Sequence, residues 1–111
     1  MKEAISIVSN VWIRQLEFEH AGDIKEEHTH PFDHQTLIAK GKFDVTVDGQ
    51  TTTFSAPQIV YVKKGLVHTF KCVSSDGLAY CIHPIRDGDE VTDIISDDQM
   101  PLLGTGLDQG V

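Results

Sequence analysis

The sequence predicts an all-β fold, a sandwich or barrel built from short strands. Three observations support this prediction. Apolar and polar residues alternate with a period of two in successive runs, and Gly, Pro or Asp turns separate these runs every eight to twelve residues. No long helical pattern interrupts them. With 111 residues, the chain has the size of one domain.

The strand pattern recurs along most of the chain. It is found at residues 11–19, 35–41, 42–54, 58–62, 67–73 and 78–85. The clearest run is a hairpin, in which alternating apolar residues are followed by Asp48-Gly49, a dipeptide typical of a two-residue type I′ turn. Near the C-terminus, apolar residues at helical spacing follow an acidic first turn and predict a short helix within residues 89–100.

The run at residues 11–19 predicts a strand with two mixed faces. One face holds Trp12, Arg14, Leu16 and Phe18, and the other holds Val11, Ile13, Gln15 and Glu17. We expect aromatic strand residues to pack in the core or to line the barrel. For Trp12 we also consider packing at a subunit interface.

Charge is concentrated at the C-terminal end of the chain. The net charge of −8 comes from 9 basic and 17 acidic residues, and residues 87–111 hold seven of the acidic ones with no Lys or Arg. Residues 1–86 are therefore close to neutral. We expect a β-barrel domain over residues 1–86 and an acidic extension over 87–111 that packs on the barrel or trails from it. Because no basic stripe exists, nucleic-acid binding is not expected.

The sequence favours a cytoplasmic protein that does not contact membranes. No apolar run approaches the roughly 20 residues of a membrane helix, and the first ten residues lack the features of a signal peptide. The two cysteines, Cys72 and Cys81, lack CxxC spacing and are most simply two free, semi-buried thiols. A disulfide, or a metal ligand at Cys72, is the alternative.

Half of the six histidines lie in one stretch of seven residues, HTHPFDH at 28–34. His28 and His30 share a side if the chain is extended there. A turn at the PFD sequence would bring His34 back over them, and His68 begins another strand pattern. Converging imidazoles are typical of sites for Zn, Cu, Fe and Ni. A polar loop that happens to be rich in histidine is the alternative interpretation, and the clustering favours a metal site.

Residues 22–72 resemble the two sequence motifs of the cupin superfamily. GDIKEEHTHPFDHQTLIAKG is similar to the first motif and PQIVYVKKGLVHTFKC, more loosely, to the second. The matching positions are Gly22, His28, His30 and Gly41 in the first motif and Gly65 and His68 in the second. His34 stands where the first motif usually has Glu. The positions that depart from the second motif are Pro57, Lys63 and Cys72.

The resemblance implies a double-stranded β-helix, the jelly-roll barrel of cupins, with a metal near its centre. It implies that His28, His30 and His68 bind the metal and that His34 is a fourth ligand, as in the four-histidine subset of small cupins. The metal would be a divalent first-row ion, Mn, Fe, Ni, Cu or Zn. Because four neutral imidazoles leave the site charge at +2, we expect a small anionic, chelating molecule as its partner.

The resemblance also implies a metal-dependent enzyme that oxygenates, isomerises or cyclises a small anionic or oxygenated molecule. His83 and Tyr80 are the candidates for a general acid or base. His83 faces the cavity or lies outward at a strand end; the pattern leaves both open. Alternatives are a non-catalytic module that senses or stores metal and ligand, and a structural protein that metal stabilises. We expect a homodimer, because many small cupins dimerise.

Overall fold

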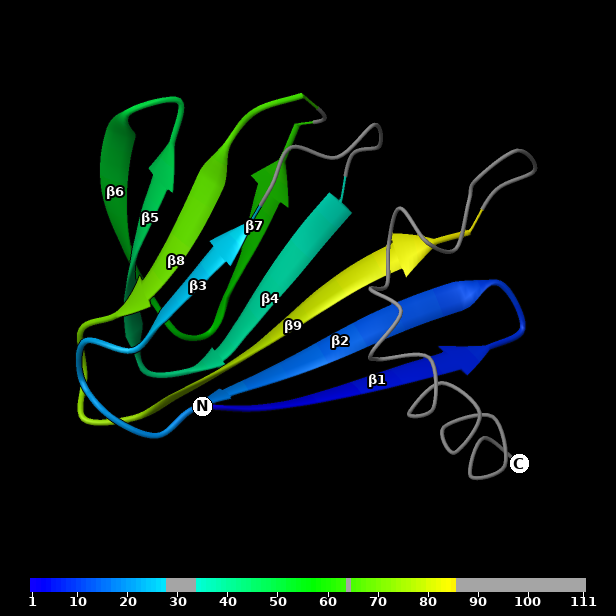
Figure 1. Cartoon of the computed structure of the whole chain (residues 1–111), viewed down its shortest axis with the longest axis horizontal. Helices are drawn as coiled ribbons and strands as arrows, with labels where there is room; N and C mark the ends of the chain where they lie inside the picture. The colour runs from blue at the N-terminus through cyan, green and yellow to red at the C-terminus, as the bar shows by residue number, and fades with distance from the viewer. Residues whose placement is uncertain (28–33, 64, 86–111) are drawn as a thin grey trace.

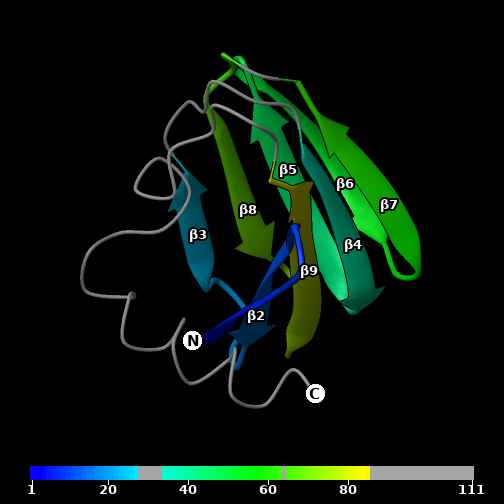
Figure 2. The same cartoon turned by 90° about the vertical axis from the view of Figure 1, so that its right-hand side faces the viewer.

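A computed structural model describes residues 1–27, 34–63 and 65–85 and shows two antiparallel sheets (Figure 1). The strands of the described residues are β1 (Lys2–Val8), β2 (Val11–Phe18), β3 (Ile24–Glu27), β4 (His34–Lys40), β5 (Lys42–Val47), β6 (Gln50–Ser55), β7 (Gln58–Val62), β8 (His68–Cys72) and β9 (Gly77–Pro84). One sheet has the order β1-β2-β9-β4-β7 and the other β3-β8-β5-β6. Figures 1 and 2 show β9 between β2 and β4, and β8 between β3 and β5. The predicted all-β jelly roll is confirmed.

The core lies between the two sheets, on the inner face of each. β2 and β9 alternate strictly between buried and more exposed residues, as strands with one solvated face do. Phe43, Val45 and Phe70 come from the opposite sheet and are almost fully buried. Trp12 is only 4% exposed and belongs to this core. The alternative that Trp12 packs at a subunit interface is therefore wrong, because the chain itself covers the inner face of β2.

One end of the barrel is filled by apolar residues, and we call it the apolar end. Its residues are Leu16, Phe18, Phe43, Cys72, Gly77 and Ala79, all buried. The rings of Phe18 and Phe43 pack edge to face with centroids 4.8 Å apart. A Cβ added to Gly77 would lie 2.6 Å from Cζ of Phe43, so this close approach requires glycine.

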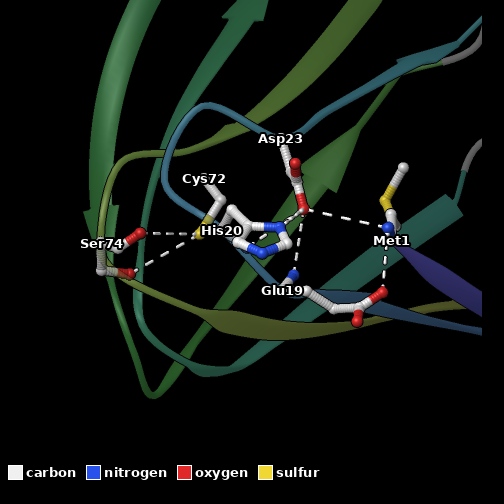
Figure 3. Close-up of polar contacts among 6 residues, drawn as sticks. All are labelled: Met1, Glu19, His20, Asp23, Cys72 and Ser74. Carbon is white, nitrogen blue, oxygen red and sulfur yellow. Dashed lines mark hydrogen bonds and ion pairs between the residues drawn. The ribbon is translucent and has the colours of Figure 1, made fainter.

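Backbone and side-chain hydrogen bonds hold the turns at the apolar end. Oδ2 of Asp23 accepts from the backbone N–H of Glu19 at 3.0 Å and of His20 at 3.1 Å, and Figure 3 marks these contacts with dashed lines. The N–H of Cys72 donates to the carbonyl of Asp23 at 2.9 Å and thereby links this turn to β8. The backbone N–H groups of Glu19, His20, Gly22 and Asp23 are thus all paired within the protein.

The structure confirms most of the expected strands and adds two. At Asp48 and Gly49 the φ angles are +51° and +78°, as a type I′ turn requires. β1 and β3 were not predicted. β1 is an edge strand that buries only two apolar residues, and β3 is mostly polar, so neither carries a full alternation. The helix expected within residues 89–100 and the extension over 87–111 lie outside the described residues.

Both cysteines are buried, and neither forms a disulfide. This confirms the expectation of two thiols without a bridge. Thr36 Oγ1 lies 3.6 Å from Cys81 Sγ in the middle of the larger sheet. In the part of the chain that the structure describes, no helix has the length and hydrophobicity needed to cross a membrane.

Candidate functional site

Histidines gather at the end of the barrel opposite the apolar end. β4 begins at His34, β8 begins at His68, and His83 is the last residue but one of β9. Figure 1 shows the starts of β4 and β8 and the end of β9 on the same side of the molecule. We call this side the histidine end. His28 and His30, which belong to the segment between β3 and β4, lie outside the described residues.

His68 is held in one orientation at the start of β8. Its side chain is 2% exposed, and Nδ1 lies 3.1 Å from the carbonyl oxygen of Leu66. Because a carbonyl only accepts hydrogen bonds, Nδ1–H is the donor and the lone pair of the neutral ring is on Nε2. A backbone carbonyl fixes metal-binding histidines in this way in many proteins.

His83 lies on the inner face of β9 and is fully buried. The sequence left open whether His83 faces the cavity or lies outward, and the structure shows that it faces inward. Across the sheet, His83 pairs with Trp12 of β2. The printed pairing of β4 with β9 ends at Gln35 and Ile82, the residues next to His34 and His83 in their strands. His34 itself pairs with Val62 of β7.

Tyr80 belongs to the other face of β9. It is half-buried and alternates with the fully interior residues Ala79 and Cys81. Its neighbours across the sheet are Gln15 on β2 and Leu37 on β4. The structure therefore brings only His83, of the two acid–base candidates, to the interior.

Arg14 is an interior residue that the sequence analysis did not select for the site. It is 7% exposed and pairs with Cys81 across the sheet. Its guanidinium carbon lies 5.2 Å from the centroid of the Trp12 ring, within cation–π range. The signal was available, because Arg14 shares its alternation with apolar residues that line the core. An arginine in such a series places a permanent positive charge in the interior.

Trp12 adds a second polar group to the same region. Its indole Nε1–H is buried and has no hydrogen-bond partner among the described residues. An unsatisfied buried donor costs about 1–3 kcal/mol, so a group of this kind needs an explanation.

No three His, Cys, Asp or Glu side chains that could hold a metal ion come together within residues 1–27, 34–63 and 65–85. Two of the four expected ligands, His28 and His30, are outside these ranges. The four-histidine ligand set is thus neither confirmed nor contradicted, and it stays a prediction.

The family described as Cupin domain matches residues 15–83, well over half of the chain. The chain belongs to the cupin family. The match begins within β2, ends within β9 and includes strands of both sheets. A comparison with curated proteins found no match.

Several solved structures share this fold at low sequence identity. A cupin superfamily protein from Desulfitobacterium hafniense is 20% identical, with a TM-score of 0.64 over 75% of this chain and 74% of that one. KdgF from Halomonas sp. is 17% identical, with a TM-score of 0.64 over 77% and 79%. An RmlC-like cupin with a double-stranded β-helix fold from Methanocaldococcus jannaschii is 16% identical, with a TM-score of 0.65 over 76% and 81%. These likenesses establish the double-stranded β-helix of this cupin.

Proposed function

We propose that this cupin is a metal-dependent enzyme that acts on a small anionic molecule at the histidine end. The observation that carries the proposal is the presence of two buried histidines, His68 and His83, beside the start of β4 at one end of the barrel. The proposed ligands are His28, His30, His34 and His68. Buried imidazoles that converge on an interior suit a divalent first-row metal, Mn, Fe, Ni, Cu or Zn.

The orientation of His68 supports such a metal. The hydrogen bond from Nδ1 of His68 to the Leu66 carbonyl leaves Nε2 as the nitrogen with the lone pair, which is the state a metal ligand requires. A bound metal would supply a Lewis acid that polarises an oxygen of the substrate.

Arg14 and Trp12 support an anionic substrate. A guanidinium in a low-dielectric interior attracts a carboxylate or enolate oxygen more strongly than one at the surface does. The Nε1–H of Trp12 would donate to such an oxygen and so lose its unsatisfied state. We therefore propose that Arg14 and Trp12, both on β2, bind and orient the substrate.

His83 is the candidate for proton transfer. It lies beside Trp12 on the neighbouring strand, so a molecule that accepts a bond from Trp12 would also come close to a ring nitrogen of His83. In this role the imidazole would accept a proton from the substrate or return one during oxygenation, isomerisation or cyclisation.

A second candidate function is a non-catalytic module that binds the metal and a small ligand. The position of Tyr80 favours it, because a tyrosine on the outer face of β9 cannot supply an acid to the interior. For either function we propose a cytoplasmic location, since two thiols without a disulfide fit a reducing compartment.

Elemental analysis of protein purified without added metal tests the proposal. The wild type should carry about one metal ion per chain, and H34A and H68A should lose it. H20A is the matched control, because the His20 side chain is 78% exposed at the apolar end. A wild type without stoichiometric metal, or an H20A variant that loses metal as fully as H68A, would contradict the ligand assignment.

A further inference from the structure

A groove at the apolar end opens on the outer face of the five-stranded sheet. Its volume is about 350 Å³, at the lower end of the range for small-molecule sites. Glu17, Leu78 and Lys40 line it and lie in one row across β2, β9 and β4, with the half-buried Leu78 in the middle. The groove therefore has an apolar floor between two side chains of opposite charge.

A β-bulge brings Lys40 to this outer face. The register between β4 and β9 shifts between Ile38 and Lys40. In a regular strand Lys40 would share the inner face with Ile38, because residues two positions apart face the same side. Ile38 is fully buried, whereas Lys40 is exposed and pairs with Leu78 on the outer face. Bulges often re-aim a side chain in this way next to functional sites.

Each wall of the groove has hydrogen-bonding capacity that the described residues do not use. Nζ of Lys40 donates to Oδ2 of Asp76 at 2.9 Å, which positions the ammonium group and leaves two of its three donors for another acceptor. Glu19, which also lines the groove, is paired with the Met1 ammonium group at 3.1 Å. Within residues 1–27, 34–63 and 65–85, no ion pair involves Glu17. The groove can therefore take one ammonium group at Glu17 and one carboxylate at Lys40.

We propose that this groove binds a free α-amino acid with an apolar side chain. The ammonium group contacts Glu17, the carboxylate contacts Lys40, and the side chain lies on Leu78. The spacing supports this class of ligand, because paired positions on β2 and β4 are two strand spacings, about 10 Å, apart. An α-amino acid with a hydrogen bond at each charged group spans about 9 Å. The proposal is independent of the metal site, since the groove lies on the outer surface at the other end of the barrel.

Titration of the isotope-labelled full chain with L-leucine, followed by its amide NMR signals, tests the proposal. The signals of Gly77 and Leu78 should shift and saturate, with a dissociation constant in the millimolar range, because exposed charge pairs each contribute little. Two analogues of leucine each keep one charged group: isoamylamine keeps the ammonium group and isocaproate keeps the carboxylate. Each analogue should bind about threefold more weakly than leucine, since one wall of the groove is left unused.

Two variants separate the two walls. E17Q should weaken binding of leucine and isoamylamine about threefold and leave isocaproate unchanged, whereas K40M should weaken leucine and isocaproate and leave isoamylamine unchanged. K71M is the matched control, because Lys71 is also an exposed lysine but lies on β8 in the other sheet. The amide spectra verify that each variant is folded.

Three results would overturn the proposal. The first is a wild type whose groove signals do not saturate with leucine. The second is a wild type that binds either analogue as tightly as leucine, which would mean that the groove does not use both charged groups. The third is a K71M variant that loses affinity for leucine as strongly as K40M does.

Discussion

The two ends of the barrel differ in what their interiors contain. At the apolar end, Phe18 and Phe43 pack against glycine and the turns are held by hydrogen bonds between neighbouring segments. At the histidine end, the interior holds polar groups that an apolar core would exclude, namely Arg14, His68 and His83. The same two sheets pass through both ends. The difference indicates that one end secures the fold, so that the other can keep groups whose burial is costly.

The comparison predicts that the largest losses of stability come from the apolar end. Gly41 has a φ of +91°, and a Cβ added there would lie 2.5 Å from the carbonyl oxygen of Asp76. We expect G41A to lower the free energy of unfolding by about 3 kcal/mol, because backbone atoms must move and the φ angle is unfavourable for alanine. Chemical denaturation measures this loss.

A second glycine separates the effect of the close backbone contact from the effect of the φ angle. Gly49 has a φ of +78° in the hairpin turn, but nothing lies within 4 Å of its added Cβ. G49A should therefore cost only about 1 kcal/mol, the effect of the backbone angle alone. Equal losses in G41A and G49A would mean that the close packing of the apolar end contributes nothing to stability.

The next effect concerns ligand binding at the histidine end. We expect R14M to weaken binding of oxalate to the metal-loaded protein at least about tenfold, because a charge-assisted interaction in the interior is lost. R14K keeps the charge and should retain part of the affinity. Titration calorimetry measures both. If R14M binds oxalate as the wild type does, the interior cation has no role in ligand recognition.

The smallest effect that we expect is a loss of stability at acid pH, caused by the carboxylates of Glu19 and Asp23 at the apolar end. A hydrogen bond that the Met1 ammonium group donates to the Glu19 carboxylate lowers the pKa of Glu19. Burial raises the pKa of Asp23, but hydrogen bonds from the backbone of Glu19 and His20 outweigh it and the net shift is downward. Figure 3 shows these groups around the Asp23 carboxylate.

Both carboxylates have a lower pKa in the folded chain than in the unfolded one. Their stabilising contribution is therefore present above the ordinary values of 3.8 and 4.5 and is lost as the pH falls through the folded pKa values. In D23N, the unfolding midpoint should therefore decrease less than in the wild type as the pH falls through the acid range. An unchanged decrease would show that the turn does not contribute to acid sensitivity.

Sequence patterns predicted the strands with one buried face, because their alternation follows directly from the pleat. They did not predict β3, whose sequence IKEE has too little apolar character and which is held by pairing with β8. The same alternation contained the signal for Arg14, because Arg14 shares its parity with Trp12 and Leu16. Its contact with the Trp12 ring was not part of that signal, since it depends on how the two side chains pack.

The candidate site was predictable only in part. The parity of His83 with Cys81 was visible in the sequence, and its burial confirms the inward choice. Tyr80 and His83 are three residues apart in one strand, and strand residues separated by an odd number face opposite sides. The position of Tyr80 on the outer face follows from that rule. The pairing that places Trp12 beside His83 joins residues 71 positions apart, and no local pattern encodes such a contact.

The two buried thiols have a practical consequence for measuring motion in this protein. Cys72 lies in the apolar end, and Cys81 pairs with Arg14 next to the histidine end. Each thiol reacts with an alkylating reagent only when its surroundings open, so its alkylation rate reports the frequency of that opening. The native chain therefore contains one chemical probe at the apolar end and one in the middle of the larger sheet, and mass spectrometry can compare how often the two regions open without introducing any label.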